Sequence, residues 1–286
     1  MTCICLVAVM SAVHVCASMS MPMSPEPSAE TCRDRFTWPF ASTSIWNMPV
    51  GSGALFDPAQ LFPSPATPAS VFLDTEYFYA TTDADPWTPW YHQGWWAGRT
   101  SHCTVIGPLV GEIQFPANAT VTMGGNNAAA LLLPDNVTLL QLQPLYRCKV
   151  GSPILAQDFV MHRENESILE DGMYGAHGGS GLSSIGGSLR LGELLPDSPP
   201  IRHALKLELF ANHYFNSFPC FYWPARQCDG YAHNESNPLF YNGTNPYMGP
   251  GALLAVPSDL AAALEAQMST IPGAKLLAAL TDYGGV

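Results

Sequence analysis

The sequence predicts an all-β protein: a jelly-roll-like antiparallel β-sandwich with long loops and one or two short C-terminal helices. Three observations predict this class. Short apolar segments alternate with turn residues at intervals of roughly 8–12 residues, which is the spacing of strands in sandwiches and barrels. Residues 201–210 alternate apolar and charged side chains with a period of two, as a half-buried strand does. Segments with the composition of helices occur only near the C-terminal end.

The strand candidates begin at about residue 71, where apolar segments first alternate with turns. Four of them are short runs rich in β-branched or aliphatic residues, bounded by Gly, Pro, Asn or Asp. They are residues 111–115 (GEIQF), 119–123 (ATVTM), 128–133 (AAALLL) and 137–143 (VTLLQLQ).

The clearest alternation of apolar and polar side chains covers residues 201–210 (IRHALKLELF). Every second residue from Ile201 is apolar except His203, and the opposite face carries Arg202, Lys206 and Glu208. A period of two with one charged face predicts a half-buried strand. The pattern therefore places His203 among leucines on the core side or concave side of a sheet.

Two helices are expected at the C-terminal end. Residues 257–268 begin with Ser258 as a plausible N-cap and Asp259 in the first turn. Residues 273–285 contain good helix formers, with Gly284 as a candidate C-cap.

The chain divides into a leader and one large domain. Residues 1–18 form an uncharged apolar run that ends in small residues, which predicts a secretory signal peptide. Residues 19–36 read as a flexible lead-in, and residues 37–286 as a single β-sandwich domain that is truncated at its C-terminus. No later run approaches the length of a membrane-spanning helix, so no membrane span is expected.

Two further features favour a secreted, extracellular glycoprotein. Five of the eight cysteines lie outside the leader, where Cys103–Cys148 and Cys220–Cys228 are candidate disulfides. The fifth cysteine, such as Cys32, is then unpaired or joined to another chain, and the missing CxxC spacing disfavours a zinc ribbon. Five N-x-S/T sequons predict glycosylated surface loops: Asn118, Asn136, Asn165, Asn234 and Asn242.

The charge composition restricts the partners. Eleven basic residues against 23 acidic ones give a net charge of −12, and only three of the basic residues are lysines. Nucleic acids and anionic membrane surfaces are therefore disfavoured, because both require clustered cations. The expected partner is an extracellular glycan, and the oligomeric state is left open.

Residues 172–194 contain eight glycines, and they match no nucleotide-binding or nucleophile motif. The third glycine of a dinucleotide fingerprint is missing, no lysine completes a phosphate loop, and no G-x-S-x-G is present. Two interpretations remain. The glycines form tight turns and bulges, or they let a ligand approach the backbone closely.

The candidate catalytic residues lie in and after this segment. His203 is the first acid–base candidate and His177 the second, because imidazole titrates near neutral pH. Glu193 and Asp229 would form the carboxylate pair of a glycosidase, and Arg190 would hold the substrate. Structural alternatives exist for three of them: a core histidine, an Arg190–Glu193 pair, and an Asp–Gly turn.

No cofactor or metal is expected, because His177, Glu193 and His203 lack the spacing of a metal motif. Aromatic loops would form the rim of the cleft, where indole rings stack on sugars; their alternative is a small core beneath the loops. The substrate-binding candidates are Trp90, Trp95, Trp96, Trp223, Tyr222 and Arg226.

Several motifs together carry a resemblance. They are SxWNxP (44–49), GAHGGSGLSSIGG (175–187), RxGEL (190–194), RHALKL (202–207), WPA…DG (223–230) and ALTDYG (279–284). Over residues 37–286 the chain resembles a group of secreted, mostly uncharacterised microbial and algal proteins. The resemblance implies an extracellular β-rich protein whose tail continues beyond DYG. It implies no catalytic residue.

These features favour a secreted polysaccharide-active enzyme, a glycoside hydrolase or a polysaccharide lyase, with a His/carboxylate/Arg cleft. The alternative is a non-catalytic glycan-binding or cell-wall module. A third possibility is a structural coat or matrix protein, which the odd cysteine would allow to assemble covalently.

Overall fold

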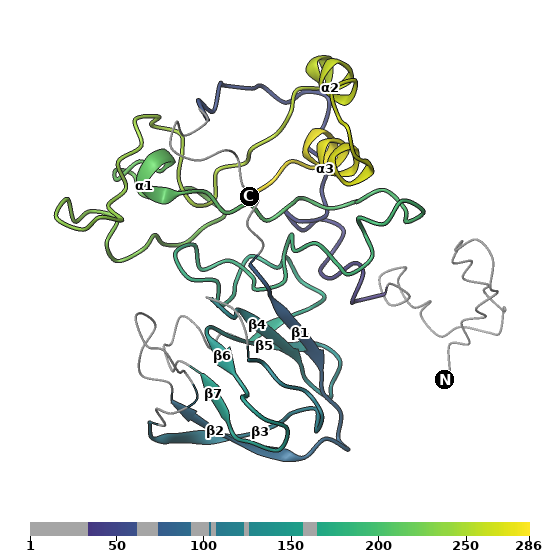
Figure 1. Ribbon diagram of the computed structural model, residues 1–286, viewed down its shortest axis with the longest axis vertical. Coiled ribbons are helices and arrows are strands. Elements are labelled where there is room, and N and C mark those ends of the chain that lie inside the picture. The colour runs from purple at the N-terminus through teal and green to yellow at the C-terminus, as the bar shows by residue number, and fades with distance from the viewer. Residues whose placement is uncertain (1–33, 62–73, 93–102, 104–106, 123–125, 157–164) are drawn as a thin grey trace, which may run out of the picture.

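The computed structural model describes residues 34–61, 74–92, 103, 107–122, 126–156 and 165–286 (Figure 1). The predicted signal peptide, most of the lead-in, Cys32, Trp95 and Trp96 lie outside the described residues. The domain limits proposed from the sequence therefore stay predictions.

Strands of the described residues form two four-stranded sheets (Figure 1). The first sheet has the order β1-β4-β5-β8, with bounds Tyr77–Ala80, Ala129–Leu132, Thr138–Leu142 and Asn165–Ser167. The second has the order β3-β2-β7-β6, with bounds Leu109–Gln114, Trp87–His92, Ile154–Ala156 and Leu145–Tyr146. The strand-rich class is confirmed, and three predicted segments (111–115, 128–133 and 137–143) supply β3, β4 and β5.

Both sheets are mixed, which differs from the purely antiparallel sandwich that the sequence predicts. The β4–β5 pair is an antiparallel hairpin in which Ala129 lies opposite Leu142. In contrast, β1 runs parallel to β4, and β2 runs parallel to β7. Both parallel pairs join strands that are far apart in sequence, and a long crossover connection permits this arrangement.

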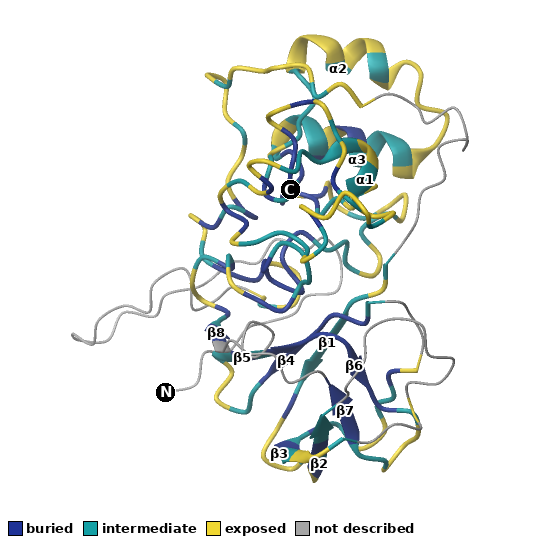
Figure 2. Ribbon diagram, turned by 90° about the vertical axis from the view of Figure 1, so that its left-hand side faces the viewer, coloured by how far each residue is buried: buried dark blue, intermediate teal, exposed yellow. Residues whose placement is uncertain are grey.

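Strand β4 is buried on both faces, which explains its unbroken apolar sequence. Ala129 and Leu131 face the second sheet and share a core with Ile113 and Ile154. The alternate residues of β4, with Leu139 of β5, face the opposite way and contact Trp46 and Leu182. The first sheet is thus the middle layer, between the second sheet and a layer of loops (Figure 2).

The loop layer contains most of the chain beyond β8, and residues 201–210 belong to it. The strand predicted there is wrong: only an isolated bridge joins Leu205 to Gly285. Leu205 donates to Gly284 O and accepts from the Val286 N–H. The neighbouring N–H groups bond elsewhere, from Ala204 to Trp46 O and from Lys206 to Gly187 O, so no ladder forms. At the beginning of residues 201–210, apolar and polar side chains alternate because some are buried and others are exposed, not because the segment is a strand.

The described part of the loop layer contains three helices: α1 (Ala211–Tyr214), α2 (Ser258–Glu265) and α3 (Ile271–Asp282). The two predicted C-terminal helices are confirmed, and α1 is not anticipated by the sequence pattern. The N-cap of α2 is Pro257 rather than Ser258, whereas Gly284, with φ +74°, follows the end of α3 as expected. Among the described residues, no helix has the length and apolarity needed to cross a bilayer.

The glycines at 186 and 187 make room for a buried tryptophan. Trp46 is fully buried, and its Nε1 donates to Gly172 O at 2.7 Å. A Cβ on Gly186 would lie 2.3 Å from the Trp46 ring, and one on Gly187 would lie 2.6 Å from it. This part of the glycine-rich segment is therefore packed against protein and not against a ligand.

Candidate functional site

A pocket of about 680 Å³ opens in the loop layer, within the usual size range of small-molecule sites. Its walls are formed by residues 177–180 of the glycine-rich segment, by 206–212, by 227–231 and by 248–252. Its polar lining side chains are Asn126, Gln143, His177, Ser180, Lys206, Glu208, Asn212, Gln227, Asp229, Tyr231 and Tyr241.

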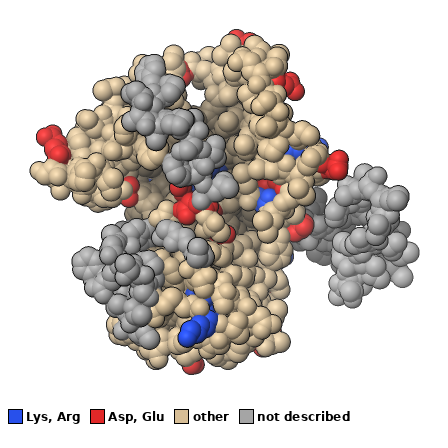
Figure 3. Space-filling model, viewed as in Figure 1, with Lys and Arg blue, Asp and Glu red and all other residues tan. Residues whose placement is uncertain are grey.

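One wall is an ionic cluster around His177. The His177 Nε2 atom lies 3.3 Å from Glu208 Oε1 and 3.4 Å from Glu76 Oε1. Glu76 accepts from Lys206 Nζ at 2.5 Å, and Lys206 also donates to Ser184 O at 2.8 Å. Acidic side chains gather at the hollowed centre of the face in Figure 3.

Burial and charge act in opposite directions on these groups. Burial lowers the pKa of Lys206, although Glu76 beside it has the opposite effect. The His177 ring holds the pKa of Glu208 below its ordinary value, against the effect of burial. Burial raises the pKa of Asp74, a further acidic neighbour of His177. The cluster around His177 contains three carboxyl groups, those of Asp74, Glu76 and Glu208, and one amino group, that of Lys206.

The second wall carries Asp229. The Tyr241 hydroxyl donates to Asp229 Oδ2 at 2.7 Å. Burial and then Asp229 raise the pKa of Tyr231 to about 12, and the pKa of Tyr241 is raised for the same reasons, so both phenols stay protonated. Gly179, with φ +79°, brings the backbone so near that a Cβ would lie 3.1 Å from Asp229 Oδ2. The group that approaches the backbone here is a protein carboxylate, so this contact does not distinguish the two interpretations of these glycines.

The structure separates the remaining catalytic candidates from this pocket: His203, Glu193 and Arg190 are not among its lining residues. His203 is 2% exposed, with Nδ1 2.7 Å from Ala204 O and Nε2 3.2 Å from Glu193 Oε1. Glu193 also accepts from the Arg190 N–H at 2.6 Å, and this bond closes a turn. The predicted Glu193–Asp229 carboxylate pair is therefore not assembled around the pocket.

The end of the Arg190 side chain is also enclosed. Its two terminal guanidinium nitrogens are buried and have no hydrogen-bond partner among the described residues, and burial lowers its pKa. From α3, Lys275 Nζ donates to Glu193 O at 3.1 Å and to Ser198 O at 2.7 Å. These contacts tie α3 to residues 193–198 of the loop layer. His203 agrees with the core-histidine alternative, whereas Glu193 bonds the backbone N–H of Arg190 and not its terminal guanidinium nitrogens.

The aromatic candidates also divide. Trp90 is 5% exposed and lies on β2 in the core between the sheets, so it belongs neither to the pocket lining nor to a small core beneath the loops. Trp223 is 71% exposed, and its neighbour Tyr222 donates its N–H to Pro250 O on the pocket wall. Arg226 lies 4.2 Å over the ring of Tyr174.

Sequence reasoning misses the acidic and basic partners of His177. The alternation over 201–210 places Lys206 and Glu208 on the solvent face of a strand, and Asp74 and Glu76 fall in no motif. The Glu76–Lys206 pair joins positions 130 residues apart, so no local pattern could indicate it. The one available signal is that Lys206 and Glu208 lie two residues apart in a chain with few charged residues.

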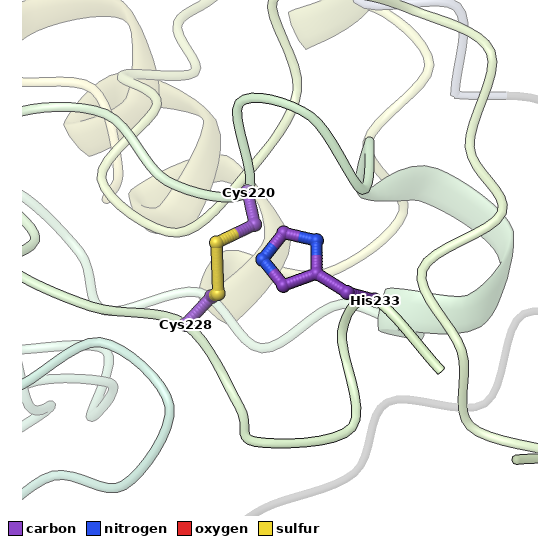
Figure 4. Close-up of side chains that lie close together, drawn as sticks. All are labelled: Cys220, Cys228 and His233. Carbon is purple, nitrogen blue, oxygen red and sulfur yellow. A yellow bond between two sulfur atoms is a disulfide. The ribbon is translucent and has the colours of Figure 1, made fainter. Parts of the chain in front are cut away.

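The Cys220–Cys228 disulfide borders the pocket, because Cys228 is one of its lining residues. Both predicted disulfides are present, and the second joins Cys103 to Cys148. The His233 ring lies beside the Cys220–Cys228 disulfide, with a ring nitrogen within 4.8 Å of both sulfurs (Figure 4). The two sulfurs are bonded to each other and offer no thiolate to a metal.

No protein-family model, curated protein sequence or solved structure matches this chain. The resemblance noted from the motifs is not tested by these comparisons and stays a prediction. The functional assignment therefore depends on the geometry of the pocket.

Proposed function

We propose that this chain is a secreted enzyme that acts on an extracellular polysaccharide, with the pocket of about 680 Å³ as its catalytic cleft. The observation that carries the proposal is that two of the five candidate catalytic residues, His177 and Asp229, line the same pocket. Asp229 would contact the substrate as the reacting carboxylate. On the opposite wall, His177 would be the second polar group that faces the substrate.

Hydrolysis is the favoured chemistry because the pocket is acidic. A lyase acting on uronic polymers needs a cationic group to neutralise the substrate carboxylate. Among the described residues, Lys206 is the one basic side chain of the pocket lining apart from His177, and it is engaged by Glu76. A neutral glycan suits this charge distribution better than an anionic one.

Secretion, glycosylation and a jelly-roll-like connectivity belong to the same proposal. The two disulfides are compatible with an oxidising compartment. Four of the five sequon asparagines are exposed, as surface glycosylation requires: Asn118, Asn136, Asn234 and Asn242.

The test is a substrate screen that measures new reducing ends, followed by two substitutions. Asp229→Asn and His177→Gln should each reduce turnover at least about 100-fold, within the range typical of acid–base groups. Glu193→Gln, in the separate cluster, should retain most activity if circular dichroism shows an intact fold. If Asp229→Asn keeps full activity and a folded Glu193→Gln loses it, the assignment of the active site to this pocket is wrong.

A non-catalytic glycan-binding module is the second candidate, and the exposed aromatic residues favour it. Phe218, Trp223 and Tyr247 are 83%, 71% and 66% exposed. Such rings can stack on sugar faces. Glycan-array binding that is lost in Trp223→Ala, without turnover by the parent protein, would support this function over catalysis.

A further inference from the structure

One group of side chains at the pocket has the composition of a metal site. One ligand atom each from Asp74, His177 and Glu208 can be chosen so that the three lie within 4.8 Å of one another. The three residues come from separate segments of the chain. His177 and Glu208 also line the pocket, so a group held there would face its interior.

We propose that Asp74, His177 and Glu208 bind one divalent transition-metal ion, of the Zn²⁺ or Mn²⁺ class. One imidazole nitrogen and two carboxylate oxygens form a mixed N/O ligand set, which suits these ions better than Mg²⁺ or Ca²⁺. Three protein ligands leave at least one coordination position for water or a sugar hydroxyl from the pocket. The inference departs from the sequence-based expectation that no metal is bound.

The charge balance supports a dication. Lys206 compensates Glu76, with 2.5 Å between Nζ and Oε1. The carboxylates of Asp74 and Glu208 remain, and among the described residues their neighbours include the amide of Asn126 and the ring of His177. A divalent ion beside a neutral imidazole would bring the formal charge of the cluster to zero.

The orientation of His177 is an independent indication. Its Nε2 atom is fully buried, yet among the described residues it makes no hydrogen bond of acceptable geometry with either neighbouring carboxylate. On the other side of the ring, Nδ1 lies 3.2 Å from Gly178 O. A backbone carbonyl there selects the tautomer with a proton on Nδ1 and a lone pair on Nε2, which is the usual second-sphere contact of a metal-bound histidine.

The experiment uses the full chain without a polyhistidine tag, stripped with a chelator and then dialysed. Isothermal titration with ZnCl2 and MnCl2 should give one saturable site, and bound Mn²⁺ should lose its free-ion electron paramagnetic resonance signal. Asp74→Asn and Glu208→Gln should each weaken binding at least about tenfold, the lower limit for even second-sphere changes. The Glu208 side chain is 48% exposed, so its replacement leaves the packing little changed.

Two matched variants serve as controls. Glu193→Gln and Asp229→Asn remove comparable carboxylates outside the trio and should keep the parent affinity. The absence of saturable Zn²⁺ and Mn²⁺ binding, or unchanged affinity in both ligand variants, would overturn the metal site. Because binding is measured without substrate, either outcome is distinct from a failure of the proposed enzymatic function.

Discussion

Glu166 of β8 provides the sharpest quantitative prediction about stability. Its side chain is 5% exposed, and it accepts from Gln141 Nε2 and from the Tyr174 N–H, both at 3.1 Å. Burial raises the pKa of Glu166 from 4.5 to about 8, more strongly than these hydrogen bonds lower it. At neutral pH the folded protein therefore holds a proton on Glu166 that the unfolded chain has released.

The sign of the pH effect follows from this difference in protonation. The folded pKa of Glu166 exceeds the unfolded one, so its contribution to stability is present below about pH 4.5 and is lost as the pH rises toward 8. At 1.36 kcal/mol for each unit, the loss between pH 4.5 and pH 7 is about 3 kcal/mol. A glutamine side chain at this position has no titrating proton, so the Glu166→Gln variant should escape this loss.

The assay is urea denaturation of both proteins between pH 4.5 and pH 8, followed by circular dichroism. The advantage of Glu166→Gln over the parent should grow by about 3 kcal/mol from pH 4.5 to pH 7. Glu112→Gln, at an exposed strand position, is the control and should show no such trend. A difference between Glu166→Gln and the parent that stays constant with pH would refute the reasoning.

Three further predictions follow from packing, disulfides and exposure. Gly186→Ala should lower the free energy of unfolding, measured by thermal denaturation, by about 1–3 kcal/mol, because the added Cβ would overlap Trp46. Gly111→Ala is the control, since a Cβ there would meet open space. Equal losses of stability in the two variants would contradict this reasoning. Replacing Cys220 and Cys228 by serine should lower the free energy of unfolding in urea by roughly 2–3 kcal/mol, the value for a disulfide that closes a short loop. An unchanged urea midpoint would show that this disulfide does not stabilise the fold. After expression in a secretory eukaryotic host, mass spectrometry should find glycans on the exposed sequons; unmodified peptides throughout would count against secretion. These sequons are Asn118, Asn136, Asn234 and Asn242.

Local patterns predict those elements whose formation depends on local chemistry. Residues 128–133 and 137–143 supply β4 and β5, because short aliphatic runs between turn residues favour paired strands. The helix over 273–285 is predicted from helix formers and a terminal glycine, and α3 ends where that glycine adopts a positive φ. Both disulfides are also paired correctly from the sequence.

Residues 201–210 mark the limit of such patterns. Alternating side chains indicate which residues are buried, but a strand also needs a neighbour with free backbone groups over its whole length. Here the N–H groups of residues 204–206 bond to three separate segments, at Trp46, Gly284 and Gly187, so only an isolated bridge forms. His203, expected on the core side or concave side of a sheet, is buried, but it lies in the loop layer against Glu193.

The sequence by itself determined the strand-rich class, the C-terminal helices and the disulfide pairs. It also singled out the glycine-rich segment, of which residues 177–180 line the pocket. Only the tertiary structure decided that His177 and Asp229 share a pocket while His203, Glu193 and Arg190 lie elsewhere. It also decided that Glu76 and Lys206 meet across 130 residues. The physical reason is that propensities and caps act within a few residues, whereas a site is formed by loops whose contacts depend on the packing of the whole chain.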